Sequence, residues 1–301
     1  MEYTLKSSFL GERATHKITK DEFDRLSSSR AFISTYMRFE ETVLQTIYAG
    51  QDFEEFILST ALNYYLFPIG EYEFFQDTRL RANLRTNAFL NSVTSLRDQF
   101  PKFRSRRNLT RLHDEFKGHW DEARTNSAAF SFLERLRNYA QHQTQPIGFV
   151  TTGGAWDRER DLLETRMSVY VEVEPICRNR EVSMDEAEKY KSELGNRADI
   201  SLIFRESMGI IGKIVKKIRD RTKEDFDHSI NNIEEYLSIM KSYVSEDVPC
   251  HFDILVTHEG DVSREFTLFP DFTRRAQKLR RTFLMENHHK HFVSNRAFGH
   301  K

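Results

Sequence analysis

Apolar residues recur at intervals of three and four over most of the first 145 positions, a spacing that places them on one face of a helix. Between Lys20 and Phe67 the recurring positions are Phe23, Leu26, Phe32, Ile33, Tyr36, Met37, Val43, Leu44 and Ile47. The pattern predicts a helical stretch over 20–67, with a break near Ala49 and Gly50. A second helix is expected from Glu71 to Phe100, where Pro101 ends it.

The next well-patterned helix begins near Asn126 or Ser127, either of which can accept a hydrogen bond from the first free backbone amides. Its apolar stripe consists of Ala129, Phe130, Leu133, Leu136 and Ala140. Pro146 and Gly148 end it. The segment before this helix, from Lys102 to Trp120, is rich in Arg and Lys and has only a weak apolar pattern.

After Gly148 the period changes from that of a helix to that of a strand. Met167, Val169, Val171 and Val173 alternate with Ser168, Tyr170, Glu172 and Glu174. This alternation predicts a half-buried strand, for which 149–155 is the expected partner. The segment 251–269 predicts a hairpin that turns at Glu259 to Asp261.

Three more helices are expected at about Ser183–Leu194, Ile200–Arg221 and Lys223–Tyr243. The fold class is therefore mainly α, with an α+β elaboration that contains short antiparallel strands. We expect a helical bundle with an N-terminal extension over 1–145 and the elaboration over 146–301. The helices at about 199–245 are candidates to pack back on the bundle, so the change of class near residue 145 need not be a hinge.

Composition adds few constraints. The 301 residues carry a formal net charge of -1, with a pI near 6.9, so any surface for nucleic acid must be local. Cys177 and Cys250 lie far apart without the spacing of a zinc or redox site, which is typical of reduced thiols. No segment resembles a signal peptide or a membrane span. The expectation is a soluble cytoplasmic protein with no membrane partner.

The window "LERLRNYAQHQTQPIGF" (133–149) carries the candidate chemistry. It contains Arg137, Asn138 and His142, with four residues between the Arg and the His. This arrangement resembles the signature of the HEPN superfamily, in which ribonucleases carry Arg, then a polar residue that is often Asn, then His. The flanking residues also resemble bacterial HEPN-like proteins in which a Pro and a small apolar patch follow the His. The resemblance covers the helical half of the chain.

The residue types suit metal-independent RNA cleavage. Histidine can act as a base on the 2′-hydroxyl and as an acid for the leaving oxygen, and arginine can stabilise charge on the phosphate. On an ideal helix Arg137 and His142 point about 140° apart, whereas Asn138 and His142 differ by about 40°. The HEPN resemblance implies that two such helices meet in a homodimer around one composite site. Two His142 side chains would then divide the acid and base roles, and Asn138 would hydrogen-bond the imidazole or a phosphate oxygen.

The resemblance further implies a toxin or antiviral defence effector with an RNA substrate and an antitoxin or regulatory partner. The competing hypotheses are a catalytically inactive HEPN module that binds RNA or a partner protein, and a helical structural protein outside the family. A second triplet, Arg107, Asn108 and His113, competes for the same role. It lies in a basic run with little periodicity, and the first triplet is therefore preferred.

Basic residues near the motif form the preferred RNA-binding candidate, because the run and the motif belong to one bundle. These residues are Lys102, Arg104, Arg106, Arg107 and Arg111. Further basic runs occur at 213–221 and 274–281 and are weaker candidates. The histidine-rich stretch "ENHHKHF" (286–292) lacks the partner ligands of a metal site, and no glycine-rich phosphate loop is present. The sequence thus predicts no cofactor and no metal.

Overall fold

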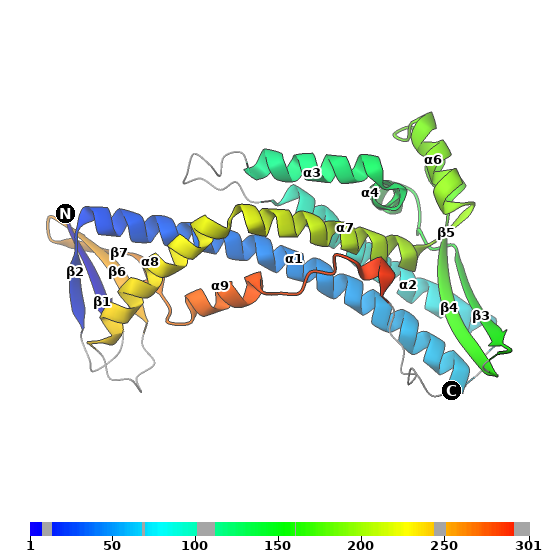
Figure 1. Ribbon diagram of the computed structural model, residues 1–301, viewed down its shortest axis with the longest axis horizontal. Coiled ribbons are helices and arrows are strands. Elements are labelled where there is room, and N and C mark those ends of the chain that lie inside the picture. The colour runs from blue at the N-terminus through cyan, green and yellow to red at the C-terminus, as the bar shows by residue number, and fades with distance from the viewer. Residues whose placement is uncertain (8–13, 68–69, 101–111, 160, 244–250, 292–301) are drawn as a thin grey trace. The chain divides into compact units, whose positions relative to one another are not determined.

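The computed structural model describes residues 1–7, 14–67, 70–100, 112–159, 161–243 and 251–291. Helices account for 66% of these residues, and the strands form two small antiparallel sheets (Figure 1). The mainly α class with short antiparallel strands is therefore confirmed at this coarse level. The chain divides into two compact units, which do not follow the chain order. The first unit comprises Met1–Glu41, Pro101–His113 and Lys217–Phe283, and the second comprises Thr42–Phe100, Asp114–Lys216 and Leu284–Lys301.

The first unit contains a four-stranded sheet with the order β2-β1-β6-β7. Its strands are β1 (Glu2–Ser7), β2 (Thr15–Ile18), β6 (Phe252–His258) and β7 (Asp261–Leu268). The expected hairpin near 259–261 is confirmed, because Glu259 and Gly260 form its turn and both adopt positive φ. The pairing of β1 with β6 was not anticipated, since it joins residues about 250 positions apart.

Two whole helices and parts of two others belong to the first unit. The whole helices are α8 (Lys223–Lys241) and α9 (Phe272–Arg280). The parts are the N-terminal residues of α1 (Lys20–Leu66) and the last residues of α7 (Ile200–Arg221). The bounds of α7 and α8 agree with the sequence pattern, because both helices carry an unbroken apolar stripe.

A buried polar network joins α1, α7 and α9 inside the first unit. Arg219 donates to both oxygens of Glu40 at 2.9 and 2.7 Å, and Tyr36 donates to Glu40 as well. Burial, reinforced by the Glu40 charge, raises the pKa of the Tyr36 hydroxyl well above its ordinary value, so this group remains a donor. Arg280 donates to the Tyr36 hydroxyl and lies over the Tyr36 and Phe226 rings.

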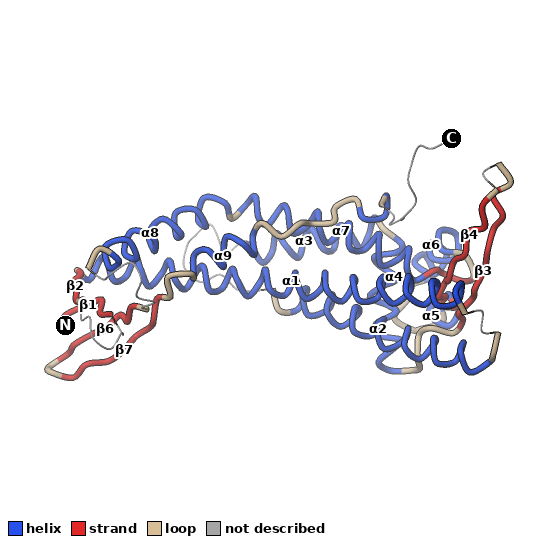
Figure 2. Tube along the Cα trace, turned by 90° about the horizontal axis from the view of Figure 1, so that it is seen from below, coloured by secondary structure: helices blue, strands red, loops and turns tan. Residues whose placement is uncertain are grey.

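The second unit contains the rest of α1 and most of the remaining helices. Figure 2 draws all helices in blue and all strands in red. They are α2 (Tyr72–Asp98), α3 (Leu112–Asn126), α4 (Ala128–His142), α5 (Val173–Cys177) and α6 (Met184–Leu194), with most of α7. A three-stranded sheet has the order β3-β4-β5, from β3 (Phe149–Asp157), β4 (Leu162–Glu172) and β5 (Arg197–Asp199). The short 3₁₀ turn η1 (His288–Lys290) follows near the end of the described chain.

The predicted break near Ala49 and Gly50 is wrong, because α1 continues through both residues to Leu66. Gly50 has a packing role instead. A Cβ atom at this position would lie 3.3 Å from the Phe89 ring and 3.6 Å from the Met208 sulfur. The absence of a side chain lets neighbouring helices approach closely, which offsets the roughly 1 kcal/mol helix cost of glycine.

Two other features differ from the sequence pattern. The segment before Ser127 contains α3, whose buried positions Leu112, Phe116 and Trp120 recur every four residues but are too few to dominate a basic stretch. The strand expected to continue to Glu174 ends at Glu172, because Val173 begins α5. The predicted boundary near residue 145 falls between α4 and β3, inside the second unit. In the part of the chain that is described, no helix is long and apolar enough to cross a bilayer.

The buried pair in the first unit gives a stability prediction. Glu40→Gln leaves the Arg219 guanidinium buried without its counter-charge, so we expect a loss of about 3–5 kcal/mol in the free energy of unfolding. Urea unfolding followed by circular dichroism measures the change. Asp227→Asn, which breaks the exposed pair with Lys223, is the control and should cost less than about 1 kcal/mol. Equal losses for the two variants would show that the Glu40 pair is not a major source of stability.

Candidate functional site

The motif residues lie on the last two turns of α4. Ser127, one of the two cap candidates from the sequence, caps this helix, since its hydroxyl accepts from the Phe130 amide at 3.1 Å. Phe130, Leu133 and Leu136 are buried, which fixes the face of α4 that packs on the core. The helix ends at His142, where the Gln143 amide donates to the Tyr139 carbonyl. The candidate chemistry is therefore carried by a helix end with a well-defined orientation.

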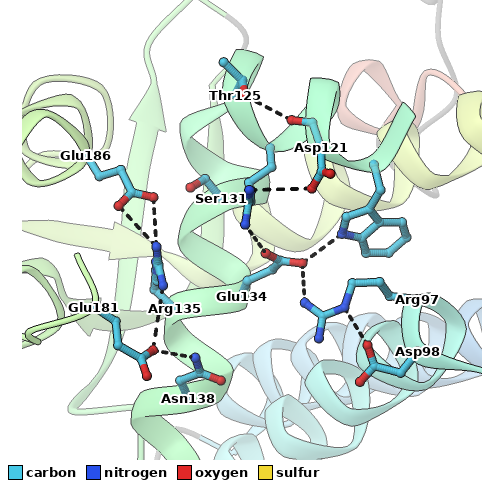
Figure 3. Close-up of polar contacts among 12 residues, drawn as sticks. Arg97, Asp98, Asp121, Thr125, Ser131, Glu134, Arg135, Asn138, Glu181 and Glu186 are labelled. Atoms are coloured by element: carbon cyan, nitrogen blue, oxygen red, sulfur yellow. Dashed lines mark hydrogen bonds and ion pairs between the residues drawn. The ribbon is translucent and has the colours of Figure 1, made fainter. Parts of the chain in front are cut away.

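Asn138 connects Arg137 to a residue that the sequence did not suggest. Its amide nitrogen donates to the Glu181 carboxylate at 2.9 Å, and its amide oxygen accepts from the Arg137 guanidinium at 3.3 Å. The two contacts define which way the amide faces. Figure 3 shows Asn138 and Glu181 pointing toward one another. Asn138 therefore orients Arg137, while its donor group is used by Glu181 rather than by His142.

Arg135 contacts the same oxygen of Glu181 as Asn138 does (Figure 3). Its guanidinium lies 3.7 Å from Glu181 and donates to both oxygens of Glu186 at 3.2 Å. Burial opposes ionisation of Glu186, but hydrogen bonds from Ser183 and from Arg135 together keep the pKa of its carboxyl below the ordinary value. Glu186 also completes a capping box with Ser183 at the start of α6. The pair of Arg135 and Glu186 therefore holds the start of α6 against α4.

The opposite side of α4 is fixed by Glu134. This carboxylate accepts from the Arg97 guanidinium at 2.8 Å and from the Trp120 indole at 2.8 Å (Figure 3). Arg97 belongs to α2 and Trp120 to α3, so Glu134 connects α4 to both helices. Charge-assisted hydrogen bonds of this kind are stronger than neutral ones, and they restrict rotation of α4.

The end of α4 is also anchored to α2 by Asn83. Its buried amide oxygen accepts from the Ile147 amide at 2.9 Å, and its amide nitrogen lies 3.3 Å from the Ile147 carbonyl. This pair of contacts satisfies the backbone of the turn that follows α4. The position of His142 relative to the core is therefore set by contacts on both sides of the motif.

His142 and Arg137 have different environments. His142 is exposed and makes no hydrogen bond or ion pair with another described residue, whereas Arg137 is half-buried. The Nε–H of Arg137 is buried and has no acceptor within the described parts of the chain. An unsatisfied buried donor typically costs about 1–3 kcal/mol. The structure brings Arg137 and Asn138 together and leaves the His142 side chain exposed.

The remaining candidates are placed less completely. The basic run Lys102, Arg104, Arg106, Arg107 and Arg111 lies outside the described residues, as does Asn108 of the competing triplet. His113 is near the start of α3. Among the described residues no group of histidine, cysteine and acidic side chains could hold a metal ion. His288, from the histidine-rich stretch, lies 3.9 Å from Glu54, whose carboxylate also binds Arg205 at 2.6 Å.

Comparisons of the chain with protein-family models, with curated proteins and with solved structures gave no match. Membership of the HEPN superfamily therefore stays a prediction from the motif window.

Sequence reasoning missed Glu181 and Asn83. Glu181 lies 43 positions after its partner Asn138, in a short polar connection without any periodicity. Asn83 lies inside α2, where asparagine is disfavoured. That unfavourable choice of residue in a helix interior was the one available signal that Asn83 has a tertiary role.

The contact between Glu181 and Asn138 can be tested in solution. Glu181→Ala removes the acceptor of the Asn138 amide, so we expect its side-chain NH₂ protons to exchange several-fold faster with solvent. Two-dimensional NMR of the amide-labelled protein measures this exchange. Glu193→Ala removes an exposed acid from α6 and is the matched control. Unchanged exchange in Glu181→Ala would show that the two side chains are not bonded in solution.

Proposed function

We propose that this protein is a metal-independent RNA endonuclease whose active site is completed by a second copy of the chain. The observation that carries the proposal is the end of α4, where Asn138 orients Arg137 and where His142 is exposed five positions later. An oriented guanidinium and an accessible imidazole on one helix end are the two kinds of group that acid–base cleavage of a phosphodiester requires. The resemblance of 133–149 to HEPN ribonucleases supports the same reaction.

In the proposed reaction one imidazole removes the proton of a 2′-hydroxyl, whose oxygen then attacks the adjacent phosphorus. The bond from phosphorus to the 5′-oxygen breaks, and a second imidazole protonates the departing oxygen. The products are a 2′,3′-cyclic phosphate and a 5′-hydroxyl. Arg137 stabilises the charge on the phosphate oxygens through its guanidinium.

The need for a second copy follows from the direction of the side chains. On an ideal helix Arg137 and His142 diverge by about 140°, and the half-buried state of Arg137 beside the exposed His142 agrees with this divergence. A symmetric meeting of two α4 ends would supply two imidazoles for the acid and base roles. The proposed assembly is therefore a homodimer.

One observation favours a second function, namely binding of RNA or a protein partner without cleavage. The Glu181 carboxylate lies beside the motif and takes the Asn138 donor, and a negative charge at this place opposes the approach of a phosphate. Arg135 offsets this charge, because it lies 3.7 Å from Glu181. We retain cleavage as the main proposal, and the experiments below separate the two functions.

Cleavage is tested with end-labelled RNA in the presence of EDTA. Wild-type protein should cut the RNA, and His142→Ala and Arg137→Ala should each reduce the rate by about 100-fold or more. The matched controls are His258→Ala and Arg158→Ala, which remove an exposed histidine and an exposed arginine elsewhere. Equal rates for all variants would reject this site. Binding without cleavage by the wild type would favour the second function.

The shared site makes a quantitative prediction for mixed dimers. If both His142 side chains act on one phosphate, a dimer with one His142→Ala subunit is inactive. An equal mixture of wild-type and variant chains, unfolded and refolded together, should have about one quarter of the activity of the all-wild-type protein. Independent subunits would retain about one half. Light scattering should also give twice the chain mass, and an active strict monomer would contradict the proposal.

A further inference from the structure

The helix α9 has an unusual distribution of charge. Between Phe272 and Met285 the chain contains five cationic residues and no acidic residue. These cations are Arg274, Arg275, Lys278, Arg280 and Arg281. The protein as a whole is nearly neutral, with a formal net charge of -1. The concentration of positive charge is therefore a local property of this segment of the first unit.

Three of the cations occupy one side of α9. Arg274, Lys278 and Arg281 follow one another at intervals of four and three, so they fall within a sector of about 60° on the helix. The spacing along the axis is about 6 Å from the first to the second and about 4.5 Å from the second to the third. All three are exposed, and none forms an ion pair within the described parts of the chain. The opposite side carries Thr273, Ala276 and Leu279, all at most 4% exposed.

The other cations of α9 have structural roles. Arg280 points inward and donates to the Tyr36 hydroxyl at 2.6 Å. Arg275 lies 4.0 Å from the Glu41 carboxylate. The carbonyls at the end of α9 are also satisfied, because Arg219 donates to the Thr282 carbonyl at 2.8 Å and lies 3.4 Å from the Leu279 carbonyl. The exposed cations are therefore not needed to cap the helix.

An exposed aromatic residue follows the charged helix in the chain. Phe283 follows Arg281 by two positions, and 79% of its surface is exposed. A ring so exposed gains nothing from burial, and its faces are open to a stacking partner. Cations that track a phosphate backbone, together with an aromatic face for a base, are the combination found in surfaces that bind single-stranded nucleic acid.

We infer that Arg274, Lys278, Arg281 and Phe283 form a binding surface for single-stranded nucleic acid. The three cations contact successive phosphates, and Phe283 stacks on a base at the end of the row. A membrane surface fits less well, because an interfacial helix must turn its apolar face to the lipid and that face of α9 is buried in the protein. The inference goes beyond the proposed nuclease, since it requires binding only.

Fluorescence anisotropy of the full chain in EDTA tests the inference, with a labelled oligothymidylate of about twelve nucleotides as the probe. DNA lacks the 2′-hydroxyl, so the proposed nuclease cannot cut it and the result does not depend on cleavage. The variant Arg274→Gln/Lys278→Gln/Arg281→Gln should weaken binding about tenfold or more at low salt. It should also reduce the slope of log affinity against log salt by about 2. Phe283→Ala should weaken binding about fivefold or more without changing that slope.

The matched control is Lys6→Gln/Lys20→Gln/Lys241→Gln, which removes the same charge from exposed positions outside the basic runs and should change affinity less than about twofold. Circular dichroism checks that each variant keeps its helix content. Equal weakening by the two triple variants would overturn the inference. Failure of the wild type to bind, or binding to vesicles of anionic lipid but not to the oligonucleotide, would overturn it as well.

Discussion

The buried ion pair between Glu40 and Arg219 connects α1 to α7 within the first unit, and further contacts of Arg219 extend the connection to α9. Glu40 is 1% exposed, so its charge requires a partner, and Arg219 supplies both hydrogen bonds. The same guanidinium reaches the carbonyls at the end of α9 and thereby positions that helix. Arg280 is drawn into the network through Tyr36. Arg219 and Arg280 thus point into the first unit. The other cations of the α9 segment, Arg274, Arg275, Lys278 and Arg281, are exposed.

The second unit uses the same physical principle at α4. Its polar residues are divided among neighbouring helices, because Glu134 bonds to α2 and α3, whereas Arg135 bonds to the start of α6. Asn83 fixes the turn that follows. These contacts hold the motif at a defined place without engaging His142. A helix end that is held by contacts on several sides and still has an accessible imidazole fits the proposed reaction, whose groups must be aligned in advance.

The proposed nuclease site and the proposed nucleic-acid surface lie on different units of the chain. The proposed nuclease depends on Arg137 and His142 of the second unit. The proposed binding surface for single-stranded nucleic acid depends on the α9 segment of the first unit. Both concern phosphate chemistry, yet neither requires the other. The near-neutral net charge is compatible with both, because phosphate recognition depends on the local arrangement of cations and not on the total.

The sequence by itself determined the elements whose signals are local. The bounds of α7 and α8, the hairpin of β6 and β7, and the cap at Ser127 follow from periodicity and from the residues at the ends of each element. Periodicity reports which face of an element is apolar, and this is a property of neighbours in the chain. The position of the motif on the end of α4 was predictable for the same reason.

The tertiary structure decided what each polar group contacts. The pairing of β1 with β6, the bond from Asn138 to Glu181 and the inward turn of Arg280 all join distant parts of the chain. Gly50 was misread because its role depends on the Phe89 ring and the Met208 side chain that pack against it, and both belong to other helices. A single sequence records the type of each side chain but not its partner. Partner choice depends on burial and on distances that exist only in the folded chain.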